Sequence, residues 1–294
     1  METWIVFTLL AVVMQSIRTA GQKQIARRLS VEATTLVRFL FGLPFAALYF
    51  YLLYSQDEAP LRLQGQFFLS ASLAGVAQIG ATLCLVKALT IRNFAVGTAL
   101  AKTEAIMTAL LGSLFFSATL SLLGYVSVVV GVAGLLAASN WRFSWQDLFH
   151  NESIKYGLGA GLGFALASLW IRDASLSLQA PLILSAAAVL IYMVALQALL
   201  CLLWVLLTDR KQFSLLVANL PASVFIGFSS VAGSIGWFTA MSLQEAALVK
   251  TLGQLEFVVT LLITYLYFGE RINAREYLGI VLVAISIILL LLAT

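Results

Sequence analysis

The stretch PLILSAAAVLIYMVALQALLCLLWVLL, residues 181–207, contains no charged side chain. A helix needs about 20 consecutive apolar residues to cross the hydrocarbon core of a bilayer. Inside lipid the segment has to satisfy its own backbone hydrogen bonds, so this run predicts a membrane-spanning helix. It is one of about ten such runs, which lie near residues 3–20, 31–54, 66–89, 94–116, 120–139, 154–174, 181–207, 221–243, 246–268 and 274–293.

The composition supports the same fold class for the whole chain. Hydrophobic residues make up 62% of it, charged residues 10%, and the mean hydropathy is +1.01, whereas soluble domains are about 45–50% apolar. The net charge of +4 comes from basic residues in short loops instead of a run, which indicates membrane topology and no nucleic-acid partner. Cys84 and Cys201 lack metal-ligand spacing, so we predict no metal and no cofactor.

The chain divides into two halves that resemble each other. At an offset of 152 residues Glu104 aligns with Glu256 and Thr108 with Thr260, which indicates an internal duplication. Because each half has five spans, the second half enters the membrane from the opposite side. We therefore predict an all-α integral membrane protein of about ten transmembrane helices in two inverted five-helix repeats, residues 1–139 and 154–294, joined by a linker loop at 140–153.

Basic residues predict the orientation of the termini. Most lysines and arginines of the loops fall on the side opposite the two termini in this arrangement. The positive-inside rule then places the termini outside the cytoplasm.

Two short motifs resemble a known family. YFGERI at residues 267–272 is followed by EYLG at 276–279, and AKTEAIMTAL at 101–110 is a similar stretch in the first half. They resemble the EamA family of the drug/metabolite transporter superfamily, although Ser117 and Ala118 stand where the second half has Gly269 and Glu270. The resemblance implies a secondary transporter whose helices, other than the fifth and tenth, surround a central cavity. Many relatives move amino acids or similar metabolites, often outward, and some branches have cytoplasmic termini.

Five ionisable side chains fall inside the apolar runs: Arg38, Lys102, Glu104, Lys250 and Glu256. Each costs about 2.5–3.5 kcal/mol at a helix centre, so we expect them to face the protein interior or a water-filled cavity. The aligned glutamates should lie near the membrane midplane, where they could couple transport to protons or bind a substrate amine. The alternative is a structural ion pair with Arg38 or a lysine. Lys102 is two residues from Glu104, so a partner for Glu104 has to come from another helix.

Polar neutral residues extend this predicted site. Lys250 and Gln254 are four apart and should share a helix face, although Lys250 lies near its helix end and could instead extend to the interface. Gln78 could hydrogen-bond either a ligand or a neighbouring helix. Three interior cations against two glutamates favour an anionic or zwitterionic substrate.

These features predict a transporter and not an enzyme, because no catalytic motif is present and the lone His150 lies in the linker. We expect a secondary transporter that exports a small polar metabolite, such as an amino acid, by alternating access around a midplane cavity. The alternative is a flippase for a lipid-linked or amphipathic substrate on the same fold. The expected partners are a small-molecule substrate, protons as a coupling ion and membrane lipids. The expected setting is the bacterial plasma (inner) membrane, with the protein a monomer or a homodimer.

Overall fold

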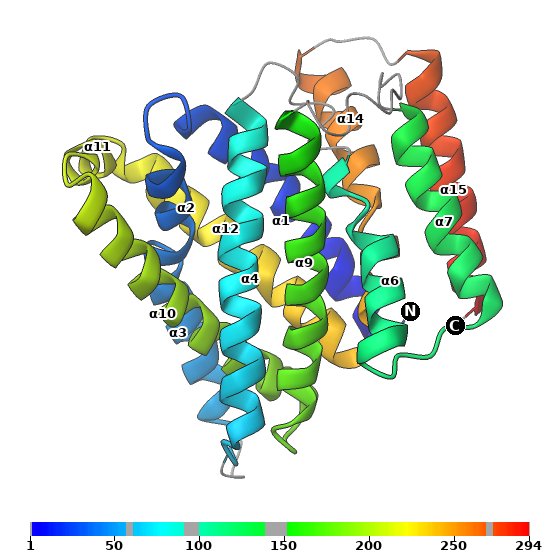
Figure 1. Cartoon of the computed structure of the whole chain (residues 1–294), viewed down its shortest axis with the longest axis horizontal. Helices are drawn as coiled ribbons and strands as arrows, with labels where there is room; N and C mark the ends of the chain where they lie inside the picture. Colours follow the sequence, from blue (N-terminus) through cyan, green and yellow to red (C-terminus); the bar gives the residue numbers. More distant parts are fainter. Residues whose placement is uncertain (1, 57–60, 91–99, 139–151, 269–272, 294) are drawn as a thin grey trace.

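The computed structural model describes residues 2–56, 61–90, 100–138, 152–268 and 273–293, which form a bundle of helices without strands (Figure 1). Outside the described residues lie, among others, Gly269–Ile272 of the motif YFGERI, nearly all of the linker and its His150. The helices of the first half are α1 (Thr3–Ile25), α2 (Val31–Leu40), α3 (Leu43–Tyr54), α4 (Gly65–Thr90), α6 (Glu104–Phe115) and α7 (Leu122–Ala138). Those of the second half are α9 (Glu152–Leu176), α10 (Leu182–Thr208), α11 (Gln212–Ala218), α12 (Leu220–Leu243), α13 (Ala246–Leu252), α14 (Leu255–Phe268) and α15 (Ala274–Ala293).

The protein is an integral membrane protein. Within the described ranges, seven helical segments are long and apolar enough to cross a bilayer: 3–22, 31–54, 65–88, 152–176, 182–208, 220–243 and 274–293. The three other predicted spans contain the shorter helices α6 and α7 and the pair α13 and α14. Large apolar side chains point outward along the bundle, among them Leu122, Leu207 and Leu292. A surface of this kind is suited to lipid.

Three predicted spans are broken in the middle, which corrects the expectation of continuous helices. The first break separates α2 from α3, where Pro44 lies in the first turn of α3 and has no backbone N–H for a continuing helix. The second separates α13 from α14 at Gly253 and Gln254. A Cβ on Gly253 would lie 2.3 Å from the Trp237 ring, so only glycine permits this approach.

The first half has a break of its own at the corresponding place. Lys102 and Thr103 form a turn, and α6 begins at Glu104. At the offset of 152 this turn lies within one residue of Gly253 and Gln254. The two glutamates therefore stand in the first turns of α6 and α14, not in the middle of continuous helices.

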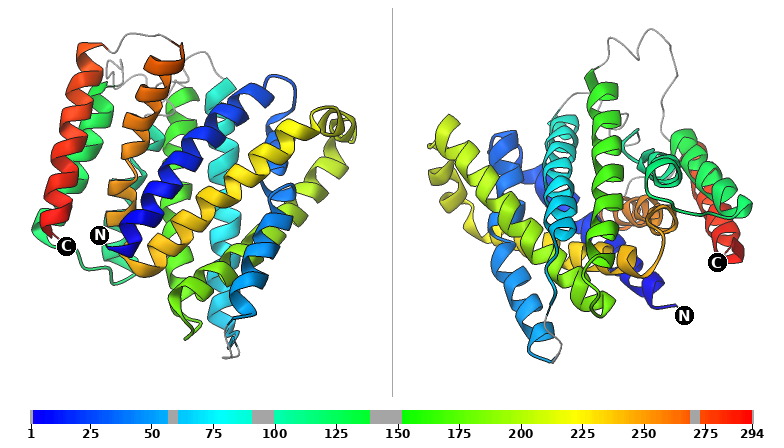
Figure 2. Two further views of the ribbon diagram at one scale, coloured as in Figure 1. Left: turned by 180° about the vertical axis from the view of Figure 1, so that it is seen from behind. Right: turned by 60° about the horizontal axis from the view of Figure 1, so that its bottom comes forward.

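Helices of the two halves pack against each other in three extensive pairs: α4 with α9, α1 with α12, and α7 with α15. Figure 2 shows α1 and α12 crossing the molecule side by side, with α7 and α15 at one edge. The helices α1 and α9, which begin the two halves, run in opposite directions (Figure 1). Small residues allow close packing: a Cβ on Gly134 of α7 would lie 2.7 Å from the Leu282 Cβ of α15.

Candidate functional site

Two ion pairs cross between the repeats. The Lys250 Nζ lies 3.6 Å from the Glu104 Oε2, and the Lys102 ammonium donates to the Glu256 carboxylate. Each glutamate is therefore paired with a lysine from the other half. The prediction that the partner of Glu104 comes from another helix is confirmed, and the partner is a lysine and not Arg38.

The helix breaks place these charges at favourable helix ends. Glu104 and Glu256 lie in the first turns of α6 and α14, where the helix dipole favours negative charge. Lys250 lies in the last turn of α13, where the dipole favours positive charge. The broken helices therefore lower the cost of ionised groups at this depth.

Lys250 is buried and does not extend to the membrane interface. Its residue exposure is 7%, and its Nζ lies 4.3 Å from the centroid of the Trp237 ring. A cation over an aromatic face is stabilised by the ring quadrupole. The Trp237 Nε1 also donates to the Gln15 Oε1 at 2.8 Å, and the Gln15 Nε2 donates to the Glu256 carboxylate at 2.7 Å. These contacts join the two ion pairs into one network.

Gln254 does not share a face with Lys250, which corrects the predicted polar stripe. The break after Leu252 separates the two residues. The Gln254 side chain instead packs against Gly131 of α7, where a Cβ would lie 2.0 Å from its Oε1. Its amide is buried without a hydrogen-bond partner in the described part of the chain. The structure therefore places Gln254 in the contact with α7.

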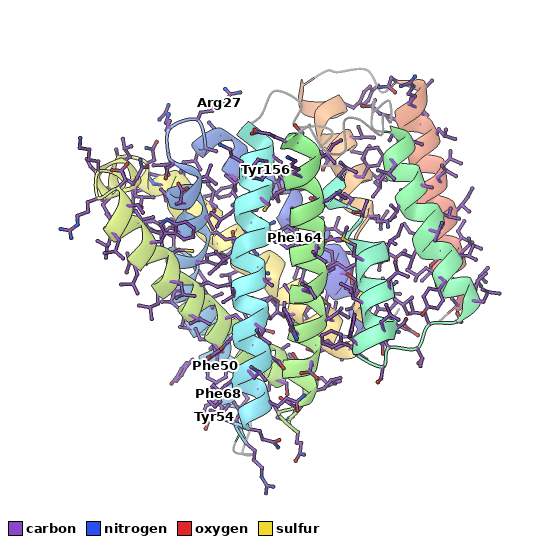
Figure 3. The ribbon with its side chains drawn as sticks, viewed as in Figure 1. Arg27, Phe50, Tyr54, Phe68, Tyr156 and Phe164 are labelled. Atoms are coloured by element: carbon purple, nitrogen blue, oxygen red, sulfur yellow. The ribbon has the colours of Figure 1, made fainter. Side chains whose placement is uncertain are left out.

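A small, partly open cavity of about 20 Å³, lined by both polar and apolar side chains, lies beside the network, with space for about one water molecule. Its wall is formed by α1, α2, α4, α9, α12 and α13: Gln15, Arg18, Arg38, Gln78, Phe164, Ala167, Ser168, Ile171, Ser234, Trp237, Phe238, Met241 and Lys250. Phe164 lies near mid-height on α9, between the two ends of the bundle (Figure 3). The cavity therefore lies between the two ends of the bundle.

Arg38 and Gln78 line this cavity as well as a smaller one of about 10 Å³ next to it. The Arg38 Nη1 donates to the Thr82 hydroxyl at 2.9 Å. Gln78 accepts a hydrogen bond of 2.9 Å from the Gln197 Nε2. Gln78 thus makes the interhelical hydrogen bond that was one of its two predicted uses, and it also faces the cavity.

Arg18 is the residue that sequence reasoning missed. It stands near the end of the apolar run at residues 3–20, but α1 continues to Ile25 and buries Arg18 to 2% exposure. The only signal was the length of the helical pattern beyond Arg18. With Arg18 included, four interior cations stand against Glu104 and Glu256, an excess of two positive charges if all are ionised.

A second polar cluster lies beside the cavity, where α9 meets the end of α12. The Arg172 Nη1 donates to the backbone carbonyls of Met241 and Gln244 at 2.9 and 2.8 Å. Its Nη2 lies 2.9 Å from the Glu245 carboxylate. Because Met241 also lines the cavity, this cluster ties α9 to the end of α12 directly beside the wall.

Comparisons with known proteins agree with this architecture. The sequence model of a family described as "EamA-like transporter family" matches residues 2–140 and 151–292. A solved structure titled "Crystal structure of protein" superposes with a TM-score of 0.76 at 13% identity, covering 99% of this chain and 97% of that chain. At this identity the likeness shows the fold alone. The search of curated proteins finds no match.

Proposed function

Because the chain belongs to the EamA-like transporter family, we propose that it is a secondary carrier of a small polar metabolite. The observation that carries the proposal is the interior cavity lined by Arg18, Arg38 and Lys250 beside ion pairs that join the two repeats. The proposed carrier has ten crossings in two inverted five-helix repeats, with α6, α7 and the pair α13–α14 completing the seven long spans. The repeats extend over residues 1–139 and 154–294, joined by the linker at 140–153.

Alternating access requires interactions that form on one side while others open. The Lys250 Nζ and the Glu104 Oε2 are 3.6 Å apart, and this ion pair has to break before the two repeats can separate there. The turns at the starts of α6 and α14 allow short helical segments to move without bending a whole span. The cluster around Arg172 supports a closed gate on the side of the termini.

The ionised network also supports coupling to protons. A proton that binds Glu104 or Glu256 removes the attraction to its lysine and so favours separation of the repeats. We propose that the coupling ion is the proton and that transport is outward across a bacterial plasma membrane, with the termini outside the cytoplasm as the basic residues favour. The protein would function as a monomer or homodimer.

The test is counterflow in proteoliposomes. Vesicles are loaded in turn with individual amino acids and other small organic acids, and uptake of the same radiolabelled solute is measured. A carrier accumulates label transiently because unlabelled solute returns the carrier to its outward-facing state and competes with the label for exit. Absence of this stimulation, with linear and non-saturable uptake, would indicate a channel and refute the proposal.

The flippase alternative is separated in the same vesicles. A fluorescent lipid in the outer leaflet becomes protected from dithionite only if the protein translocates it. Protection without counterflow of any soluble compound would favour the flippase. The cavity of about 20 Å³ has space for about one water molecule in this state, so either substrate requires the repeats to separate further.

A further inference from the structure

Arg18 and Arg38 differ from the two lysines of the cavity region. Lys102 and Lys250 each have a glutamate partner, whereas neither arginine forms an ion pair with a carboxylate within the described ranges. Both arginines line the same cavity. The positive charge of the site is therefore concentrated on this pair.

Burial raises the free-energy cost of keeping both arginines charged in this cavity. Arg18 and Arg38 are 2% and 4% exposed, and the Arg18 Nε is buried without a hydrogen-bond partner in the described chain. Two like charges in a low-dielectric interior repel each other, and each has lost its hydration. An anion between them would compensate both charges at once.

The rest of the wall indicates what kind of anion fits. It includes the polar side chains Gln15, Gln78, Ser168 and Ser234 but no aspartate or glutamate. An ammonium group in the cavity would therefore face cations with no free carboxylate beside it. Phe164, Ile171, Trp237, Phe238 and Met241 form an apolar part of the same wall.

The two arginines also break the symmetry of the repeats. At the offset that aligns the glutamates, Arg18 and Arg38 align with Trp170 and Leu190. The ion pairs use both halves, but the unpaired positive charge comes from the first half alone. This asymmetry gives the cavity one charged side toward which a polar head group can orient.

We propose that Arg18 and Arg38 form a binding site for an oxyanion head group, a carboxylate or phosphate, of a small organic anion with an apolar body. Guanidinium groups match both head groups with paired hydrogen bonds. Gln78 and Ser234 provide further polar contacts, and the body packs on the aromatic wall. This inference rests on the proposed function and narrows its substrate from polar metabolites to anions without a required amine.

The first test uses the unaltered protein in lipid nanodiscs and four probes of similar shape. Benzoate, phenyl phosphate, benzamide and benzylamine are titrated, and the midpoint of thermal unfolding is followed. At least one of the two oxyanions raises the midpoint in a saturable way, and the one that does identifies the head group. Equal stabilisation by benzamide, preference for benzylamine, or no shift with either oxyanion would overturn the proposal.

The second test locates the site. Arg18→Gln and Arg38→Gln each weaken oxyanion binding at least tenfold, Arg18→Lys and Arg38→Lys restore part of it, and the exposed Arg210→Gln retains the parent affinity. Parent affinity in both glutamine variants would overturn the assignment. If a variant does not fold, the comparison of benzoate with benzamide on the parent still tests whether the site prefers an oxyanion to its neutral analogue.

Binding and transport are read separately. Oxyanion binding that depends on the arginines, without counterflow of any solute, would leave the site intact and refute the carrier. Counterflow of amines or neutral solutes that is unchanged in folded arginine variants would support the carrier and refute the anion site.

Discussion

Replacing Glu104 by glutamine should destabilise the protein through the lysine that it leaves behind. The Lys250 Nζ lies 3.6 Å from the Glu104 Oε2, and Lys250 is 7% exposed. At an effective dielectric constant of about 20, this attraction is on the order of 5 kcal/mol before desolvation. Breaking a buried pair on one side typically costs about 3–5 kcal/mol. The Trp237 ring lies 4.3 Å from the same Nζ. Its cation–π contact still stabilises the lysine by about 2 kcal/mol after the glutamate is replaced.

We therefore expect Glu104→Gln to lower the free energy of unfolding by about 2–4 kcal/mol. Glu256→Gln should cost less, about 1 kcal/mol, because its partner Lys102 has a side chain that is 23% exposed and can contact water. The assay is reversible SDS unfolding in mixed micelles, followed by tryptophan fluorescence.

A double-mutant cycle isolates the pair. Glu104→Gln combined with Lys250→Gln should be at least about 1 kcal/mol more stable than the sum of the single effects, since neither charge is left alone. Additive effects, or a larger loss in Glu256→Gln than in Glu104→Gln, would refute the reasoning.

Three further predictions concern packing, the gate and the network. Gly227→Ala should lose about 1–3 kcal/mol of stability in the same SDS assay, because its Cβ would lie 2.4 Å from the Phe41 carbonyl carbon. Arg172→Gln should release the end of α12 and speed thiol labelling of a cavity cysteine from the side of the termini at least tenfold, as its ion pair with Glu245 is lost. Trp237→Phe should cost about 1 kcal/mol and slow counterflow, because the ring no longer donates to Gln15.

Controls for these variants come from the same chain. Gly80→Ala should be tolerated, since nothing lies within 4 Å of the added Cβ; equal losses at Gly80 and Gly227 would contradict the packing argument. Unchanged labelling in Arg172→Gln would remove the gate from the mechanism. Normal counterflow in a folded Trp237→Phe protein would show that the network acts only on stability.

Much of the fold follows from the sequence because lipid imposes strong constraints. A run such as residues 181–207 has one stable backbone solution in a bilayer, and it is the helix α10. The alignment of the two glutamates and the resemblance to the family also follow from the sequence, and the family is confirmed. The burial of Glu104 and Glu256 follows from the cost of charge in lipid.

The details of the site depend on contacts between distant segments. The Trp237 ring from another helix excludes a side chain at Gly253, where α13 ends, and local hydropathy does not record this contact. A spacing of four residues predicts that Gln254 shares a face with Lys250, whereas the structure turns Gln254 toward Gly131. Arg18 lies at the end of an apolar run, and only the packing of α1 beneath α12 shows that it is buried.

The most direct test of alternating access is the accessibility of one cavity position from each side of the membrane. Ser234, which lines both cavities, is replaced by cysteine in a chain carrying Cys84→Ala and Cys201→Ala. A membrane-impermeant thiol reagent is then applied to right-side-out and inside-out vesicles. Ser286→Cys, buried between α7 and α15, serves as the unreactive control. We predict labelling of Ser234→Cys from both sides without a continuous leak of ions, whereas labelling from one side only, or from neither, would contradict the account.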